Sequence, residues 1–106
     1  MKYLVTFKRR DSVPVPVQAI SGILTAQRDW MQERSADGTF EVAYGFPQGG
    51  GGIAIVNADS AEELSELLIG SPAFVLVDLS VQPLVDVEVS LGNSIRALQQ
   101  LAGVPA

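Results

Sequence analysis

Cysteine and histidine are both missing from this chain of 106 residues. Without cysteine, the chain can form no disulfide, no thiolate metal site and no thiol nucleophile. Without histidine, it lacks the side chain that most often serves as a general base or as a metal ligand. We therefore expect no metal site.

Basic residues are also few: 7 lysines and arginines stand against 12 aspartates and glutamates, which leaves a net charge of −5. Phosphate binding depends on clustered Lys and Arg, so this balance argues against nucleic acids and acidic membranes as partners. No apolar run approaches the roughly 20 residues that a membrane-spanning helix needs. The apolar stretch near the N-terminus is short and is followed by charges, unlike a signal peptide. We expect a cytoplasmic protein.

The length predicts a single domain over residues 1–106, with a core over 1–84 and a C-terminal extension over 85–106. A chain of this size can bury about two-thirds of its unfolded surface. Aromatic and β-branched residues in weak alternation predict a first strand over residues 2–8. Prolines follow, so a helix is not expected before Val17.

The helix that begins there is expected to face the core with residues repeating every three or four positions. These residues are Ile20, Ile23, Leu24, Gln27, Trp30 and Met31. Strict alternation over residues 40–46 predicts a second strand with an aromatic face, and residues 53–56 predict a third. Gly49 to Gly52 predict a flexible hairpin connection or a lid over a cavity mouth. A phosphate-binding loop is rejected, because a strand follows and no lysine is near.

The next segment carries clear signals for a short helix. Ser60 and Glu63 fit a capping box, in which the hydroxyl accepts from the Glu63 amide and the carboxylate from the Ser60 amide. The helix should begin near Ala61 and end at Gly70, which can take the left-handed C-terminal cap.

From Ala73 the period changes to two and predicts a fourth strand. One face is apolar throughout, with Val75, Val77, Leu79 and Val81. The other face turns polar halfway, with Phe74, Leu76, Asp78, Ser80 and Gln82.

Twelve positions between residues 60 and 84 form one ungapped pattern. They are Ser60, Glu63, Leu64, Leu67, Leu68, Gly70, Pro72, Phe74, Asp78, Val81, Pro83 and Leu84. The pattern resembles the S-x-x-E-L-x-x-L-L-x-G-x-P-x-F-x-x-x-D-x-x-V-x-P-L-like run of the muconolactone delta-isomerase family. A looser match extends back through Gly38 to the first strand. The family places a histidine near the end of the first strand and a glutamate in the middle of helix one. In the comparable regions this chain has Leu4 to Phe7, and helix one offers Gln27 beside Arg28 and Asp29.

The predicted order of strand, helix, strand, strand, helix and strand is that of the α+β ferredoxin-like βαββαβ sandwich, with both helices on one face of the sheet. The other face has too many apolar residues to be left in water, and a second copy can bury it. The resemblance implies the same pairing, as a dimeric α/β barrel. We expect a homodimer or a higher homo-oligomer. Alternation over residues 84–89 predicts an extra strand for a neighbouring sheet edge, and Asn93 or Ser94 should cap a last helix.

Three residues are the candidates for catalysis. Asp78, partly buried beside Phe74 and Leu76, would have a raised pKa and could act as general base or acid. It could equally hydrogen-bond a loop amide or an arginine for structure. Tyr3 and Tyr44 offer phenols that can donate to an enolate oxygen, although core or interface positions are the more common use of tyrosine.

Four further residues are expected to bind the substrate: Arg28, Phe46, Phe74 and Trp30. Arg28 belongs to a group of mixed charges on helix one that can equally form solvated ion pairs. Arg9 and Arg10 at a strand end could hold a substrate carboxylate or lie exposed in the turn.

The resemblance implies a cofactor-free isomerase-like enzyme that shifts a proton or double bond on a small unsaturated lactone or a related hydrophobic carbonyl metabolite. A cyclase or a cofactor-free oxygenase on the same fold is an alternative. Another class stays open, a protein that binds a metabolite without turnover or serves assembly alone. The enzyme hypothesis requires Asp78 and a tyrosine to meet in one pocket. The binding hypothesis predicts apolar walls without a perturbed carboxylate, and the assembly hypothesis predicts no pocket.

Overall fold

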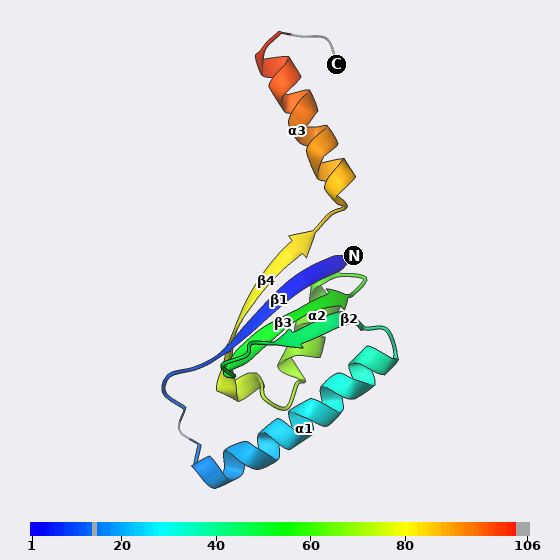
Figure 1. The fold of residues 1–106 in the computed structure, drawn as a ribbon. Coiled ribbons are helices and arrows are strands. Elements are labelled where there is room, and N and C mark those ends of the chain that lie inside the picture. The colour runs from blue at the N-terminus through cyan, green and yellow to red at the C-terminus, as the bar shows by residue number, and fades with distance from the viewer. Residues whose placement is uncertain (14, 104–106) are drawn as a thin grey trace.

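The computed structural model describes residues 1–13 and 15–103. Figure 1 shows a sheet with two helices packed beside it and a third helix that projects from it. The elements are β1 (Lys2–Arg9), α1 (Val17–Ala36), β2 (Phe40–Gly45), β3 (Gly51–Asn57), α2 (Ala61–Ile69), the short 3-10 helix η1 (Phe74–Leu76), β4 (Val77–Leu84) and α3 (Val87–Leu101). The βαββαβ order confirms the predicted fold class.

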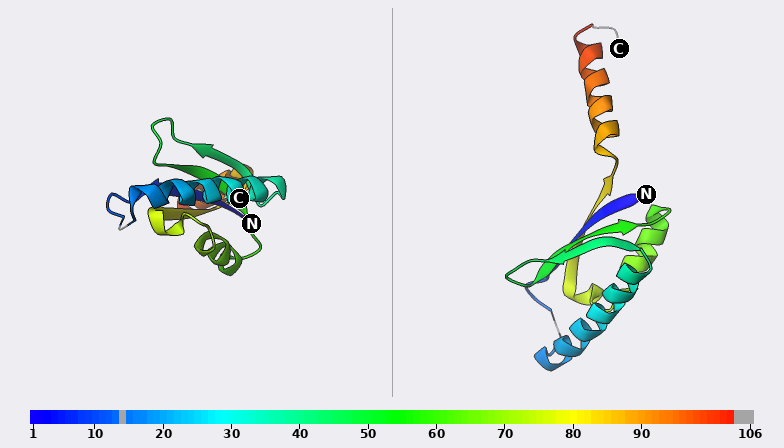
Figure 2. Two further views of the ribbon diagram at one scale, coloured as in Figure 1. Left: turned by 90° about the horizontal axis from the view of Figure 1, so that it is seen from below. Right: turned by 45° about the vertical axis from the view of Figure 1, so that its right-hand side comes forward.

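The four strands form one antiparallel sheet in the order β2-β3-β1-β4. In the register, Val5 of β1 lies opposite Ala54 of β3 and Val81 of β4, so these side chains share one face of the sheet. Trp30 of α1 and Leu64 of α2 pack against the core on that face. Both helices therefore cover the same side of the sheet, as the two views in Figure 2 also show.

The opposite side of the sheet has no helix over it. Pairing of Leu4 with Ile55, and of Tyr44 with Ile53, places these side chains on this uncovered face. A register shift between Phe40 and Val42 turns the start of β2 back toward the helices. Phe40 is thereby buried in the core while Tyr44 lies outside it.

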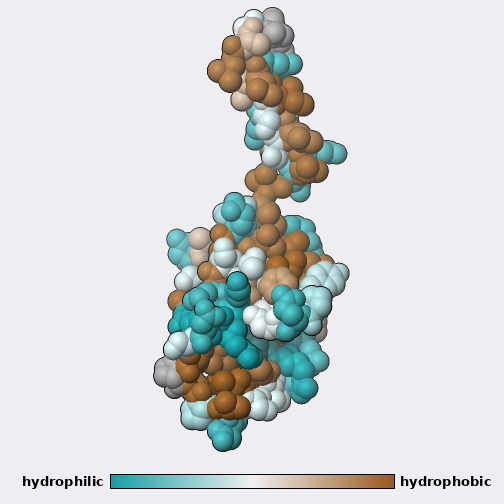
Figure 3. All heavy atoms as spheres, turned by 60° about the vertical axis from the view of Figure 1, so that its left-hand side comes forward, coloured by the Kyte–Doolittle hydropathy of each residue, from teal (hydrophilic) through white to brown (hydrophobic). Residues whose placement is uncertain are grey.

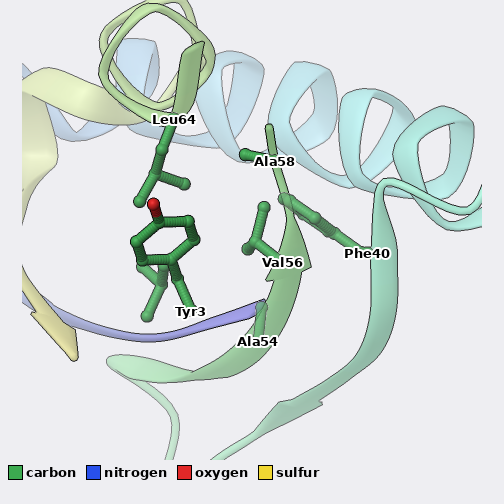
Figure 4. Close-up of a cluster of buried hydrophobic side chains, with 7 residues drawn as sticks. Tyr3, Phe40, Ala54, Val56, Ala58 and Leu64 are labelled. Carbon is green, nitrogen blue, oxygen red and sulfur yellow. The ribbon is translucent and has the colours of Figure 1, made fainter. Parts of the chain in front are cut away.

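The core lies between the sheet and α2. Figure 4 shows side chains from three strands and from α2 meeting there, with the Tyr3 ring directed from β1 toward Leu64. Val56 at the centre of the cluster is fully buried. α1 contributes the partly buried Trp30 and Met31 but has no buried residue of its own. α1 is thus less tightly packed than the strands, which leaves space beneath it.

The start of α2 is capped largely as predicted. The Ser60 hydroxyl accepts a hydrogen bond from the Glu63 N–H at 3.1 Å. The Glu63 carboxylate accepts from the Asp59 N–H, at 3.1 Å, and not from Ser60. The prediction for the other end is wrong: Gly70 has φ −78° and ψ −3°, a right-handed conformation that continues the helical turn. The chain then leaves through η1 instead of reversing at a left-handed cap.

Two predictions about the C-terminal half are wrong. Residues 74–76 form η1, so the strand begins only at Val77. The predicted strand over 84–89 and the cap at Asn93 or Ser94 are replaced by one helix, α3, which begins at Val87. Alternation over so few residues also fits the first turn of a helix, and the longer repeat toward the C-terminus decides in favour of the helix.

α3 projects from the end of β4 away from the rest of the molecule (Figures 1 and 2). The described residues accordingly span 63 Å in one direction and only 30 × 26 Å in the others. No residue of α3 is buried, and Figure 3 shows much apolar surface on it. Among the described residues, no helix is both long enough and apolar enough to cross a membrane.

Candidate functional site

A pocket of about 370 Å³ lies between α1 and the helix-covered face of the sheet. Its size falls within the range of small-molecule sites in proteins. Most of the residues that line it are apolar: Val5, Phe7, Leu24, Trp30, Met31, Phe40, Ala54, Val56, Leu68, Ala73, Leu76, Val77 and Leu79. Such walls exclude water and suit a hydrophobic ligand.

Trp30 forms one wall of the pocket and is held from two sides. Its ring meets Phe40 edge to face, with 5.4 Å between ring centroids and an interplanar angle of 75°. The Arg34 guanidinium lies over the Trp30 ring, 5.8 Å from its centroid. Edge-to-face and cation–π contacts of this kind fix an aromatic ring in place. Trp30 is the predicted binding residue that the structure places in the pocket.

Three polar side chains also line the pocket: Arg9, Gln27 and Ser71. Gln27 projects from the apolar face of α1 that the sequence predicts. Its Oε1 accepts a hydrogen bond from the Ala73 N–H at 3.0 Å, so it ties α1 to the segment before η1. Its amide is therefore held in one orientation, because a backbone N–H can only donate.

Arg9 lies at the mouth of the pocket, beside the turn that joins β2 and β3. The Arg9 N–H donates to the Gly50 carbonyl at 2.7 Å, and Gly49 to Gly51 line the pocket. Gly51 has φ +155°, and a Cβ atom there would lie 2.1 Å from the Phe7 carbonyl oxygen. Only glycine fits so close to β1. Gly49 and Gly50 thus belong to the predicted hairpin connection, whereas Gly51 and Gly52 already belong to β3.

Asp78 lies outside this pocket. Its carboxylate forms an ion pair with Arg10, at 3.0 Å from Nε, and 75% of its side chain is exposed. It pairs in register with Lys8 on the uncovered face, while its neighbours Val77 and Leu79 face the pocket. The expectation that Asp78 is partly buried beside Phe74 and Leu76 is wrong, because both of these belong to η1.

The two tyrosines lie in different surroundings. Tyr3 is 3% exposed within the core, and its hydroxyl contacts the Met1 Sδ at 3.6 Å. Tyr44 is 66% exposed on the uncovered face and borders a shallow groove beside α1. Neither lines the pocket, so the structure does not bring Asp78, Tyr3 and Tyr44 together in a single chain.

The other predicted binding residues also lie apart from the pocket. Arg28 borders two shallow grooves along α1 and pairs with Asp29 at 3.4 Å. Phe46 follows β2 and Phe74 opens η1, and neither lines the pocket. Gln27 is the pocket residue that the sequence could have revealed, since a polar residue in an otherwise apolar helix face needs a partner.

The pKa of Asp37 is lowered from its ordinary value. The causes are hydrogen bonds from Thr39, the larger from its side chain and the next from its backbone N–H. The backbone N–H lies 2.9 Å from Asp37 Oδ1. Asp37 follows α1 and holds the turn into β2, so this shift reports on local structure and not on the pocket.

Comparison with known proteins gives one family and a set of similar structures. The family model described as muconolactone delta-isomerase matches residues 1–88. No curated protein sequence matches the chain significantly.

Two solved structures illustrate the similarity in fold. A crystal structure of muconolactone isomerase superposes with a TM-score of 0.70 at 18% identity, covering 79% of this chain and 88% of the other. The 5-chloro-2-hydroxyhydroquinone dehydrochlorinase of Burkholderia phenoliruptrix AC1100, in complex with 2,5-dihydroxybenzoquinone, gives a TM-score of 0.63 at 18% identity. That match covers 84% of this chain and 98% of the other. At this identity the two structures establish the fold.

Proposed function

Because this chain belongs to the muconolactone delta-isomerase family, whose pattern spans residues 1–88, we propose that it is a small isomerase-type enzyme with its ligand site between α1 and the sheet. The proposed ligand is an unsaturated lactone or a related cyclic carbonyl compound, quinones included. The observation that carries the proposal is the pocket itself, in which apolar walls surround the few polar side chains Arg9, Gln27 and Ser71. We expect the enzyme to need no cofactor, as the resemblance implies.

The pocket suits the charge that develops in such a reaction. Shifting a double bond next to a carbonyl requires a proton to leave one carbon and to return at another, while negative charge grows on the carbonyl oxygen. Arg9 and Gln27 can donate hydrogen bonds to that oxygen. Apolar walls strengthen these bonds because they lower the local dielectric constant.

The reaction also needs a group that takes up and returns the proton. Among the described residues that line the pocket there is no aspartate, glutamate, lysine or tyrosine. The Ser71 hydroxyl is the group available there for proton transfer. A proton-carrying role for Asp78 or Tyr44 would need a ligand at the uncovered face, between two copies. We propose that the ion pair with Arg10 is the main role of Asp78 within one chain.

This same observation favours a second candidate function, which is binding of a small carbonyl compound without turnover. The apolar pocket without a perturbed carboxylate is what the binding hypothesis predicts. Assembly alone accounts less well for the structure, because that hypothesis predicts no pocket.

We further propose that the protein is a homo-oligomer. The uncovered face of the sheet carries Leu4, Ile53 and Ile55, and α3 leaves a stripe of aliphatic side chains in solvent. The stripe consists of Val87, Leu91, Ile95, Leu98 and Leu101, which are 54–85% exposed. Their spacing places all five on one side of the helix. Apolar surface of this extent is usually buried in an interface.

The experiment that tests the enzymatic proposal combines ligand binding with turnover. The wild-type protein is screened by thermal shift against small unsaturated lactones and 2,5-dihydroxybenzoquinone, and hits are followed by NMR for double-bond migration. Stabilisation together with migration supports the isomerase proposal. Stabilisation without migration supports binding alone, and no stabilisation by any of these compounds contradicts both. Ala54→Leu, which fills the pocket from β3, should abolish the stabilisation.

A further inference from the structure

Gln27 combines two properties that point to a role in ligand recognition. It lines the pocket, and its Oε1 is already occupied by the Ala73 N–H at 3.0 Å. Ala73 is buried, so this N–H has no access to solvent as an alternative partner. The amide of Gln27 can thus offer only its Nε2 group, which has two N–H donors. Within residues 1–13 and 15–103, Nε2 makes no hydrogen bond.

Arg9 offers donors as well. A guanidinium group has no acceptor and keeps its positive charge at every relevant pH. Arg9 forms no ion pair with any carboxylate of the described residues, whereas its neighbour Arg10 pairs with Asp78. Arg9 is therefore the one formally charged side chain among the described residues that line the pocket. Although the chain has a net charge of −5, the described residues that line the pocket bring one positive and no negative side chain.

From this arrangement we propose that Gln27 is a specificity-determining residue, which donates through Nε2 to an anionic or carbonyl oxygen of an apolar cyclic ligand whose charge Arg9 balances. The inference rests on the proposed function, because it assumes that the ligand occupies this pocket. It goes further by assigning the chemical class, an oxygen acceptor and not an amine. An ammonium group would meet donors and a positive charge and would lose its hydrogen bonds to water.

The hydrogen bond to Ala73 also explains why glutamine suits ligand binding at this position. The side chain is held before the ligand arrives, so binding costs little conformational entropy. A glutamate could accept the same bond from Ala73, but its second oxygen would face the ligand as an acceptor with negative charge. Glutamine and glutamate at position 27 therefore support the same local structure, but glutamine favours a ligand with an acceptor oxygen and glutamate favours a ligand with a donor or a positive charge.

The test uses this difference between Gln27→Glu and the wild type. Benzoate and benzylamine serve as probes, since they share a ring and carry opposite charges at neutral pH. Binding is measured by titration with NMR detection, including the side-chain NH₂ signals of Gln27. Gln18→Glu is the matched control, because it makes the same change on the same helix at an exposed position outside the pocket.

For the wild type we expect benzoate to bind more tightly than benzylamine and to shift the Gln27 NH₂ signals. A hydrogen bond to a charged group predicts that Gln27→Glu weakens benzoate binding by roughly tenfold to a hundredfold. The midpoint of thermal unfolding should stay close to that of the wild type, and Gln18→Glu should bind benzoate normally. Gln27→Met, which has no donor, should also weaken benzoate binding, but it removes the acceptor for the Ala73 N–H and should therefore lower the midpoint of thermal unfolding as well. Its binding is measured well below that midpoint, and Gln27→Glu, which keeps the acceptor, is the primary variant.

Equal affinity for the two probes, or unchanged benzoate binding in Gln27→Glu and Gln27→Met, would overturn the proposal for Gln27 while leaving the pocket as the ligand site. Failure of benzoate and of the lactone and quinone panel to bind the wild type would overturn both proposals. Binding that follows this pattern without turnover would support the role of Gln27 and contradict the isomerase activity.

Discussion

Replacing Leu91 and Leu98 by glutamine should weaken self-association of the protein and leave its core intact. Both side chains belong to the aliphatic stripe of α3 and are 57% and 65% exposed in the single chain. No residue of α3 is buried, so the core loses no packing when they change. Glutamine has a helix propensity close to that of leucine, so α3 itself should persist.

The size of the effect follows from the surface involved. Complete burial of a leucine side chain contributes about 1.5–3 kcal/mol. With a little more than half of each side chain to bury, the pair contributes about 2–4 kcal/mol for each helix. Two helices bury this surface in a symmetric interface, so the double variant should lose about 4–8 kcal/mol, which is at least about a thousandfold in the dissociation constant.

Sedimentation equilibrium over a range of protein concentrations measures this change. The wild type should sediment as a homo-oligomer and the double variant as a weaker or smaller one, with the same far-ultraviolet circular dichroism. Asn93→Gln combined with Gln100→Asn, on the opposite side of α3, is the control and should associate like the wild type. A monomeric wild type, or equal dissociation constants for the wild type and the leucine variant, would refute the reasoning.

Three further changes test individual contacts. Asp78→Asn removes an exposed ion pair with Arg10 and should cost less than about 1 kcal/mol in chemical denaturation, with probe binding in the pocket unchanged; a loss of binding would connect Asp78 to the site. Ser60→Ala removes the cap of α2 and should lower the free energy of unfolding by about 1 kcal/mol; an unchanged value would mean that water replaces the cap. The pKa of Asp37 is lowered in the folded protein by Thr39, so its stabilising effect is present above the unfolded pKa and is lost as pH falls through the folded one. Asp37→Asn should therefore reduce the loss of stability in acid, as measured by thermal unfolding against pH, and an identical pH profile would contradict this assignment.

The order of elements and the sheet could be predicted because each rests on a local signal. The cap at Ser60 and the strand that begins at Phe40 are properties of a few neighbouring residues, and the structure confirms both. The shared aromatic face predicted for that strand is wrong, because the register shift after Phe40 leaves Phe40 in the core and Tyr44 on the uncovered face. The position of Asp78 could not be derived in this way. Its side chain alternates with Val77 and Leu79, but which face carries the pocket depends on α1 and α2, which lie far from it in the sequence.

The C-terminal helix shows a different limit of prediction from the sequence. Val85, Val87 and Val89 alternate with acidic residues, and β-branched residues favour strands. A strand there would need a partner edge, whereas a helix satisfies its own backbone hydrogen bonds over most of its length. The Ser90 N–H donates to the Asp86 carbonyl at 3.0 Å, which marks the first turn. The helical repeat of Val87, Leu91 and Ile95 over a longer stretch thus outweighs the local strand propensity of the valines.

A last prediction concerns proton transfer in the pocket after Gln27 is replaced by glutamate. A glutamate at position 27 would place a carboxylate beside the ligand, where partial burial raises its pKa and makes it a stronger base. Gln27→Glu should therefore accelerate exchange of the proton next to the carbonyl of an unsaturated lactone in D₂O, although it weakens anion binding. Exchange is followed by NMR at saturating lactone, so that affinity does not enter the rate. Equally fast exchange in the wild type would show that a proton carrier already reaches the ligand, from Ser71 or from a second copy. Comparing Ser71→Ala with the α3 double variant would then distinguish these two sources, because only the second depends on association.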